Sequence, residues 1–153
     1  MNNQETAEVA FNAFQQALNA NLIQTESGAI HKDLIVHMDS PQGAIRLTYA
    51  LMDSAKNIKS SCVVVLTDPY KEKPCFDVGI TTSKEFRGQG FAKDVLNKCI
   101  DEMKYGFARN GISEFYLEFK VDKNNIASHS LCKIFANEII DNDISTTYMK
   151  LVK

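Results

Sequence analysis

The stretch from Phe76 to Phe107 constrains the fold more than any other part of this 153-residue chain. Its first part, Phe76 to Thr82, is rich in β-branched residues and has no helical period, which predicts a strand. Its last part has apolar residues at intervals of four, which predicts one buried face of a long helix (Phe91, Val95, Cys99, Met103 and Phe107). A short basic turn with two glycines separates the strand from the helix. We therefore expect a strand, a tight turn and a long amphipathic helix at the centre of the fold.

The turn has the features of an anion site. The first turn of a helix leaves backbone N–H groups unpaired, and the helix dipole makes this end positive. Gly88 and Gly90 have no Cβ, so a ligand can approach the main chain closely. Arg87 and Lys93 add positive charge. The sequence predicts a phosphate or diphosphate site here, although a plain glycine turn beside a solvated arginine would contain the same residues.

The turn fits one of three known kinds of phosphate loop. No Gly-x-x-x-x-Gly-Lys-Ser/Thr string occurs, and Lys93 stands where the third glycine of a dinucleotide fingerprint belongs. The segment from Arg87 to Ala92 instead matches Arg/Gln-x-x-Gly-x-Gly/Ala at every defined position. It resembles the acyl-CoA diphosphate loop of the GNAT superfamily of N-acyltransferases.

A second stretch supports this resemblance. The superfamily commonly shows Val-x-x-x-Asn-x-x-Ala/Ser-x-x-Leu-Tyr followed by Gly-Phe, and four positions here agree (Val121, Asn125, Ser128 and Leu131). Cys132 stands where Tyr is usual, and Ala136-Asn137 stands where Gly-Phe is usual. The similarity extends from about Ile30 to the C-terminus, whereas the helix predicted at Glu5–Leu22 does not match the family's usual first strand.

The resemblance implies which residues bind the co-substrate, acetyl-CoA. Main-chain N–H groups of the loop would bind the diphosphate (Arg87, Gly88, Gln89, Gly90, Phe91 and Ala92). The preceding strand would bond the pantetheine amides (Gly79, Ile80 and Thr81), and it would splay from the strand at Phe115 to open a slot. Asn125 would bond the pantetheine arm or hold its helix in place, although it fits a plain helix N-cap equally well.

Candidates for proton transfer are less sharply defined. Glu118, on the polar face of the strand beside the slot, is the first candidate for a general base, although a solvated carboxylate fits the same position. Cys132 fits a small apolar filler, a proton donor to the departing thiolate or a nucleophile. If Cys132 is inert, Tyr70, Tyr148 or water could supply the proton. His129 fits a surface residue better than an acceptor-binding one.

The order of elements predicts a mixed α/β fold. After the first helix, three or four alternating segments are joined by short turns and are expected to be antiparallel neighbours (30–38, 44–52, 61–67 and 75–82). The long helix is a crossover, so the strands at Phe76 and Phe115 should be parallel neighbours. A shorter helix and a closing hairpin follow (126–136 and 139–152). We expect one domain over residues 1–153, with a mostly antiparallel twisted sheet and helices on both of its faces.

Composition limits the partners, the location and the metal sites that we expect for this chain. The net charge of −2 gives no basic excess, so nucleic acid is not an expected partner. No apolar run approaches the roughly 18 residues of a membrane span, and the N-terminus lacks the pattern of a secretion signal, so we expect a cytoplasmic protein. The four cysteines lack metal-ligand spacing, which predicts reduced core thiols and no metal (Cys62, Cys75, Cys99 and Cys132).

Together these features predict an N-acetyltransferase. The expected reaction is direct attack by a primary amine of an unidentified acceptor on acetyl-CoA in a ternary complex. A non-catalytic acyl-CoA-binding or regulatory domain is the alternative, because the usual Tyr and Gly-Phe are missing; a phosphate-binding module unrelated to CoA is a third possibility. The closing strand Thr146–Val152 could pair two subunits, so a homodimer is possible.

Overall fold

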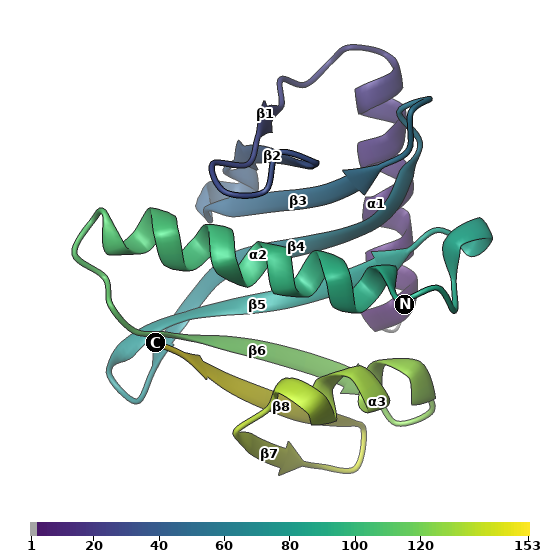
Figure 1. The fold of residues 1–153 in the computed structure, drawn as a ribbon. Coiled ribbons are helices and arrows are strands. Elements are labelled where there is room, and N and C mark those ends of the chain that lie inside the picture. The colour runs from purple at the N-terminus through teal and green to yellow at the C-terminus, as the bar shows by residue number, and fades with distance from the viewer. Residues whose placement is uncertain (1–2) are drawn as a thin grey trace.

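The computed structural model describes residues 3–153, and they form one eight-stranded sheet with three α-helices (Figure 1). Before the predicted phosphate loop (residues 87–92) lie α1 (Asn3–Asn19), β1 (Glu26–Ser27), β2 (Leu34–Asp39), the 3₁₀ turn η1 (Pro41–Gly43), β3 (Arg46–Met52), β4 (Ile58–Tyr70), β5 (Lys73–Thr82) and the 3₁₀ turn η2 (Lys84–Phe86). After it lie α2 (Phe91–Ala108), β6 (Phe115–Asp122), α3 (Ile126–Phe135), β7 (Glu138–Asp141) and β8 (Ser145–Val152).

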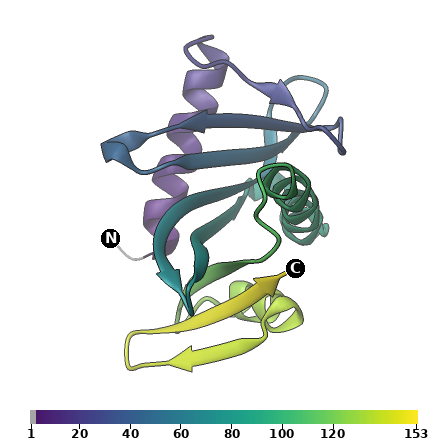
Figure 2. The ribbon, with the colours of Figure 1, turned by 90° about the vertical axis from the view of Figure 1, so that its left-hand side faces the viewer.

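The predicted fold class is confirmed. The strands follow the order β1-β2-β3-β4-β5-β6-β8-β7, and every neighbouring pair is antiparallel except β5 and β6. Helices α2 and α3 lie on one face of the sheet and α1 lies on the other (Figures 1 and 2). None of the helices within residues 3–153 combines the length and apolarity needed to cross a membrane.

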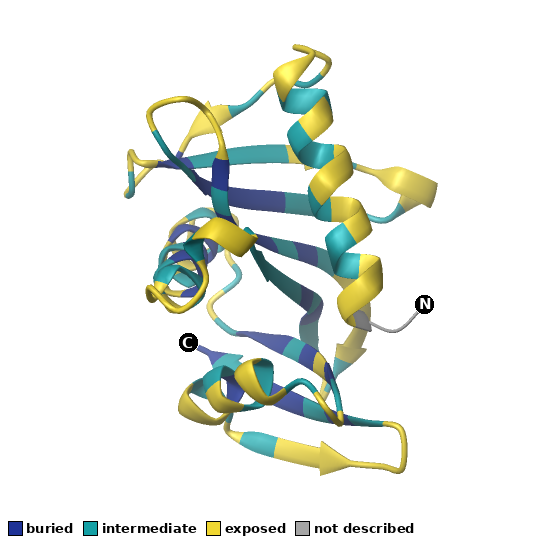
Figure 3. Ribbon diagram, turned by 90° about the vertical axis from the view of Figure 1, so that its right-hand side faces the viewer, coloured by how far each residue is buried: buried dark blue, intermediate teal, exposed yellow. Residues whose placement is uncertain are grey.

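The first helix is shorter at its C-terminal end than its pattern predicts. Asn21 adopts a φ of 56°, a left-handed conformation that stops the helix, and Leu22 is 78% exposed instead of packing inward. None of the α1 side chains described, from Gln4 to Asn19, is buried. Figure 3 shows the same contrast: α1 is exposed or half-buried along its length, while the strands beneath it contain the buried residues.

Helix α2 is packed much more tightly. Its predicted apolar face is buried against the sheet at Val95, Leu96, Cys99 and Met103. At its C-terminal end Phe107 stacks on Phe76 (5.2 Å between ring centroids) and meets Phe115 edge-on (5.1 Å). These contacts fix α2, and with it the phosphate loop, relative to β5 and β6.

A buried carboxylate ties α2 to the loop before β2. Glu102 is 8% exposed and accepts hydrogen bonds from the N–H groups of Ala29 (2.7 Å), Ile30 (2.9 Å) and His31 (3.0 Å). Gly28 is needed at the start of this loop, since a Cβ there would lie 2.4 Å from the His31 carbonyl oxygen and 2.7 Å from Glu102 Oε2. Backbone donors that no strand partner satisfies are thus paired with a side chain.

Replacing Glu102 by Gln should lower the free energy of unfolding by about 1–3 kcal/mol, because an amide nitrogen cannot accept these hydrogen bonds. Urea denaturation measures the change. Glu85→Gln, at an exposed glutamate in η2, is the control and should leave stability unchanged. Equal stability of the Glu102→Gln variant and the parent would contradict this account of the loop.

Candidate active site

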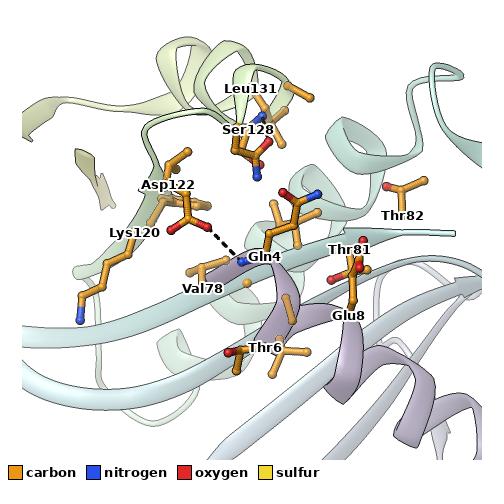
Figure 4. Close-up of a pocket in the computed structure, with 18 of the residues that line it drawn as sticks. Gln4, Thr6, Glu8, Val78, Thr81, Thr82, Lys120, Asp122, Ser128 and Leu131 are labelled. Atoms are coloured by element: carbon orange, nitrogen blue, oxygen red, sulfur yellow. Dashed lines mark hydrogen bonds between the residues drawn. The ribbon is translucent and has the colours of Figure 1, made fainter. Parts of the chain in front are cut away.

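The paired part of β5 and β6 is short. Hydrogen-bonded register runs only from Cys75–Asp77 on β5 to Tyr116–Glu118 on β6. Beyond it the strands diverge, which confirms the predicted splay. A cavity of about 550 Å³ occupies the opening and is lined by both strands, α3, the phosphate loop and the first turns of α1. Figure 4 shows Gln4 and Glu8 of α1 on one side of it and Ser128 and Leu131 of α3 on the other.

Most of the predicted site residues lie around this cavity. Its lining includes the β5 residues expected to bind pantetheine, the start of the loop and two residues of the α3 segment (Gly79, Ile80, Thr81, Arg87, Gly88, Asn125 and Cys132). The remaining loop residues lie beyond the lining, at the end of the loop and the start of α2 (Gln89, Gly90, Phe91 and Ala92). Glu118 lines a separate cavity of about 270 Å³ beside Tyr70 and Cys75.

The loop has the backbone geometry of an anion site. Gly88 and Gly90 have φ values of 73° and 84°, in the left-handed region that favours glycine. Nothing lies within 4 Å of the position of a Cβ at either residue, so the main chain is open to a ligand. Gly90 is the N-cap of α2 and provides no side-chain cap. The N–H groups of the first helical turn are therefore available to an anion.

Two positively charged side chains lie near the start of α2. The Arg87 guanidinium donates from Nε to the Thr82 carbonyl oxygen (3.2 Å) and pairs with Glu8 of α1 (3.1 Å). Lys59, which the sequence pattern did not single out, has its ammonium 4.8 Å from the centroid of the Phe91 ring. Two cations thus flank the uncapped end of α2, and one of them is linked to α1.

Asn125 is the N-cap of α3. Its Oδ1 accepts a hydrogen bond from the Ser128 N–H (3.2 Å), which confirms the capping interpretation. The same residue lines the cavity while its side-chain oxygen holds the helix.

Cys132 is a buried, protonated thiol. It is 3% exposed, and burial raises its pKa to about 12. A thiol with this pKa remains neutral near pH 7, so it is a weak nucleophile and a weak acid. The structure therefore favours the filler role among the three that the sequence left open.

His129 and the two tyrosines are engaged in structural contacts. The Nε2 of His129 lies 3.0 Å from the Asp122 carbonyl oxygen and must donate to it, so in a neutral ring Nδ1 accepts from the Tyr148 hydroxyl (2.8 Å). This network ties α3 to β6 and β8. Tyr148 is 2% exposed, and burial raises its pKa. Tyr70 donates to Glu138 (2.8 Å).

One carboxylate in the cavity was missed by sequence reasoning. Asp77 is the last residue of β5 in register with β6, and its partner is Glu118. It lines the large cavity, whereas Glu118 does not. Burial raises the pKa of Asp77; nearby Lys120 lowers it and Glu118 raises it further. Its position on the strand was visible, but its neighbours depend on the parallel register, which a sequence pattern does not give.

A comparison of the sequence with models of known protein families identifies the family of this chain. The model described as "Acetyltransferase (GNAT) family" matches residues 38–136, about two thirds of the chain. The chain belongs to the GNAT family. The matched region contains the loop, both diverging strands and all of α3. Members of this family use an acyl-CoA as co-substrate, which agrees with the open amide groups at the start of α2. No protein of curated function matches the sequence.

Solved GNAT structures share the fold. A protein assigned as an acyl-CoA N-acyltransferase from Klebsiella pneumoniae is 13% identical, with a TM-score of 0.57 over 99% of this chain and 90% of that one. A GNAT acetyltransferase from Staphylococcus aureus Mu50 is 15% identical (TM-score 0.52; 71% and 69% covered). One from Streptococcus pneumoniae is 18% identical (TM-score 0.52; 71% and 67% covered). Likeness at these identities concerns the fold alone.

Within residues 3–153, no group of three or more His, Cys, Asp or Glu side chains is arranged to hold a metal ion. The four cysteines are free and buried.

Reversing the charge of Arg87 should weaken coenzyme A binding by about a hundredfold or more, since it places a carboxylate where a diphosphate is expected. Isothermal titration with coenzyme A measures the affinity. Arg109→Glu, at the far end of α2, carries the same charge change and should bind coenzyme A as the parent does. Equal affinities of the Arg87→Glu and Arg109→Glu variants would exclude this diphosphate site.

Proposed function

We propose that this protein is an N-acetyltransferase that moves the acetyl group of acetyl-CoA to a primary amine by direct attack in a ternary complex. One observation supports this most strongly: the cavity passes through the sheet between β5 and β6. The uncapped start of α2 lies toward one face. Val78 is packed in the core with residues of α2, so the neighbouring residue Asp77 points to the opposite face, which α1 covers. Donor and acceptor can therefore reach the same point from opposite faces.

The donor would bind along the free edge of β5. Its diphosphate is held by the main-chain N–H groups of Gly88 to Ala92, with Arg87 beside it. Beyond Asp77 the edge of β5 that faces β6 is released from the ladder, although the other edge stays paired with β4. Along Gly79, Ile80 and Thr81, the backbone groups that point away from β4 are therefore free to pair with the pantetheine amides. Asn125 meets the same arm from α3. The thioester then lies close to Asp77, where the strands begin to diverge.

We assign Asp77 as the general base in place of Glu118. An amine with a pKa of about 10.4 is mostly protonated at pH 7 and must lose a proton before it attacks. Asp77 accepts that proton directly or through one water molecule. The amine nitrogen then bonds to the thioester carbon while a main-chain N–H of β5 stabilises the oxyanion. The C–S bond breaks, the CoA thiolate leaves, and the nitrogen, now part of the amide, gives its extra proton to water.

Cys132 is assigned no chemical step. The CoA thiol, taken to resemble an unperturbed thiol, has a pKa of about 8.5, so a donor with a pKa of about 12 would transfer its proton uphill. The thiolate instead leaves unassisted or takes a proton from water. No structural observation favours the alternative of a non-catalytic acyl-CoA-binding domain. Four buried free thiols suit a reducing compartment such as the cytoplasm.

Asp77→Asn should lower kcat about a hundredfold or more and leave the affinity for acetyl-CoA within about twofold of the parent's, because it removes a base and keeps the shape. Glu118→Gln is the matched control, since it neutralises the partner of Asp77 in the strand register. Thiol release across a panel of primary amines measures both variants. A larger loss for Glu118→Gln than for Asp77→Asn would reverse the assignment.

The same residue gives a pH-dependent effect on stability. Because the pKa of Asp77 is raised in the folded chain, ionisation of this carboxyl destabilises the fold at pH values above its unfolded pKa of about 4. Asp77→Asn should therefore be at least as stable as the parent at pH 7, and this advantage should disappear below about pH 4. Thermal unfolding between pH 3 and pH 8 tests this. A variant less stable than the parent only at neutral pH would contradict it.

A further inference from the structure

The cavity has a second arm under α1, on the side away from α2 and α3. We call it the acceptor arm and define it by Ala7 and Ala10 of α1, Val63 and Val65 of β4, Asp77 of β5 and Lys120 of β6. The donor enters from the α2 face in the proposed function, so this arm is where the amine must lie.

Helix α1 is held above the sheet at both of its ends. Near its start, the Gln4 N–H donates to Asp122 (3.2 Å; Figure 4) and Glu8 pairs with Arg87 (3.1 Å). Near its end, the Gln15 side chain accepts from the Ile58 N–H (2.7 Å). These contacts span the acceptor arm, so the helix is fixed as its outer wall.

Between these contacts the helix does not fill the space beneath it. Val63 and Val65 are only partly buried although α1 crosses the face on which they lie, whereas Val64, on the other face, is 1% exposed. From the helix the arm is lined by the small side chains of Ala7 and Ala10. The acceptor arm is therefore a narrow space with apolar walls on two sides, suited to an apolar body.

The charged side chains around the acceptor arm suit a substrate with one positive charge. Glu8 is paired with Arg87, and Asp39 binds the guanidinium of Arg46 through two hydrogen bonds (2.9 and 2.6 Å). Asp122, which also lines the cavity, accepts a hydrogen bond from the Gln4 N–H at the start of α1. Asp77 is the carboxylate of the acceptor arm, and Lys120 lies close enough to act on it.

From this arrangement, and resting on the proposed function, we propose that the acceptor is a primary monoamine with an uncharged, apolar body. Its nitrogen lies at Asp77 and its body lies between α1 and β4. A second ammonium group would lie against alanine and valine or near Lys120. It would lose its hydration there, and the other carboxylates of the cavity, Glu8 and Asp122, already have hydrogen-bond partners. Polyamines are therefore poor acceptors for this enzyme.

A matched pair of acceptors tests the charge selection. Hexylamine and 1,6-diaminohexane have the same length and differ in the second amine. With acetyl-CoA and the full chain, kcat/KM should favour hexylamine by about tenfold or more, which corresponds to about 1.4 kcal/mol. A diamine, or spermidine, that is acetylated as efficiently as hexylamine would overturn the proposal.

A substitution in α1 tests the location of the acceptor arm. Ala10→Leu should raise the KM for hexylamine about tenfold by filling the arm, and it should leave the KM for acetyl-CoA within about twofold of the parent's. Val9→Leu adds a methylene group at a neighbouring residue that is 56% exposed and is not part of the cavity lining, so it should change neither constant. An unchanged KM for hexylamine in Ala10→Leu would refute the acceptor arm.

The two proposals fail in distinguishable ways. If acetyl-CoA binds and a polyamine is the preferred acceptor, the substrate class proposed here is wrong and the N-acetyltransferase function stands. If coenzyme A does not bind the parent protein in the titration with the Arg87 variants, the proposed function falls, and the acceptor class falls with it.

Discussion

The structure of this site depends on the loss of pairing between β5 and β6 after Asp77 and Glu118. A sheet is normally closed between neighbouring strands by its hydrogen-bond ladder. Here the two strands diverge within the sheet, so a cavity runs from one face to the other and backbone groups of β5 are free for a ligand. Every role proposed for the donor, the acceptor and the base follows from this opening.

The two faces of the opening are built differently. On one face, α2 buries its apolar side against the sheet, and it presents an uncapped N-terminus beside Arg87 and Lys59. On the other face, α1 has no buried side chain from Gln4 to Asn19, and hydrogen bonds tie it to the sheet near both of its ends. A tightly packed helix suits the fixed diphosphate, which every acyl-CoA shares. A loosely packed helix suits an acceptor that differs between enzymes.

The ion pair between Glu8 and Arg87 joins these two faces. Arg87, the residue expected to contact the diphosphate, thus also helps to hold α1, the outer wall of the acceptor arm. A guanidinium group has five N–H donors, so Arg87 can bind a phosphate oxygen and keep its contact with Glu8. Binding of the donor is thus compatible with α1 in the position seen here.

The sequence predicted the parts of the site that local patterns determine. The glycine loop, the apolar face of α2 and the alternation of β6 each follow from a short stretch, and so does the Asn125 cap. Asp77 was missed because its importance depends on register and depth, and the pKa of Cys132 depends on burial by distant segments. Strand β1 was not predicted because its two residues, Glu26 and Ser27, have no apolar pattern. The role of α1 was not predicted because it depends on the cavity beneath the helix.

The central claim is that exposed amides at the start of α2 and the opened edge of β5 together bind coenzyme A. A crystal structure of the protein with coenzyme A tests it most directly. We predict that the diphosphate oxygens accept hydrogen bonds from the backbone of Gly88 to Ala92 and that the pantetheine arm lies between β5 and β6. Density for the cofactor elsewhere, with both the loop and the opening unoccupied, would contradict the account.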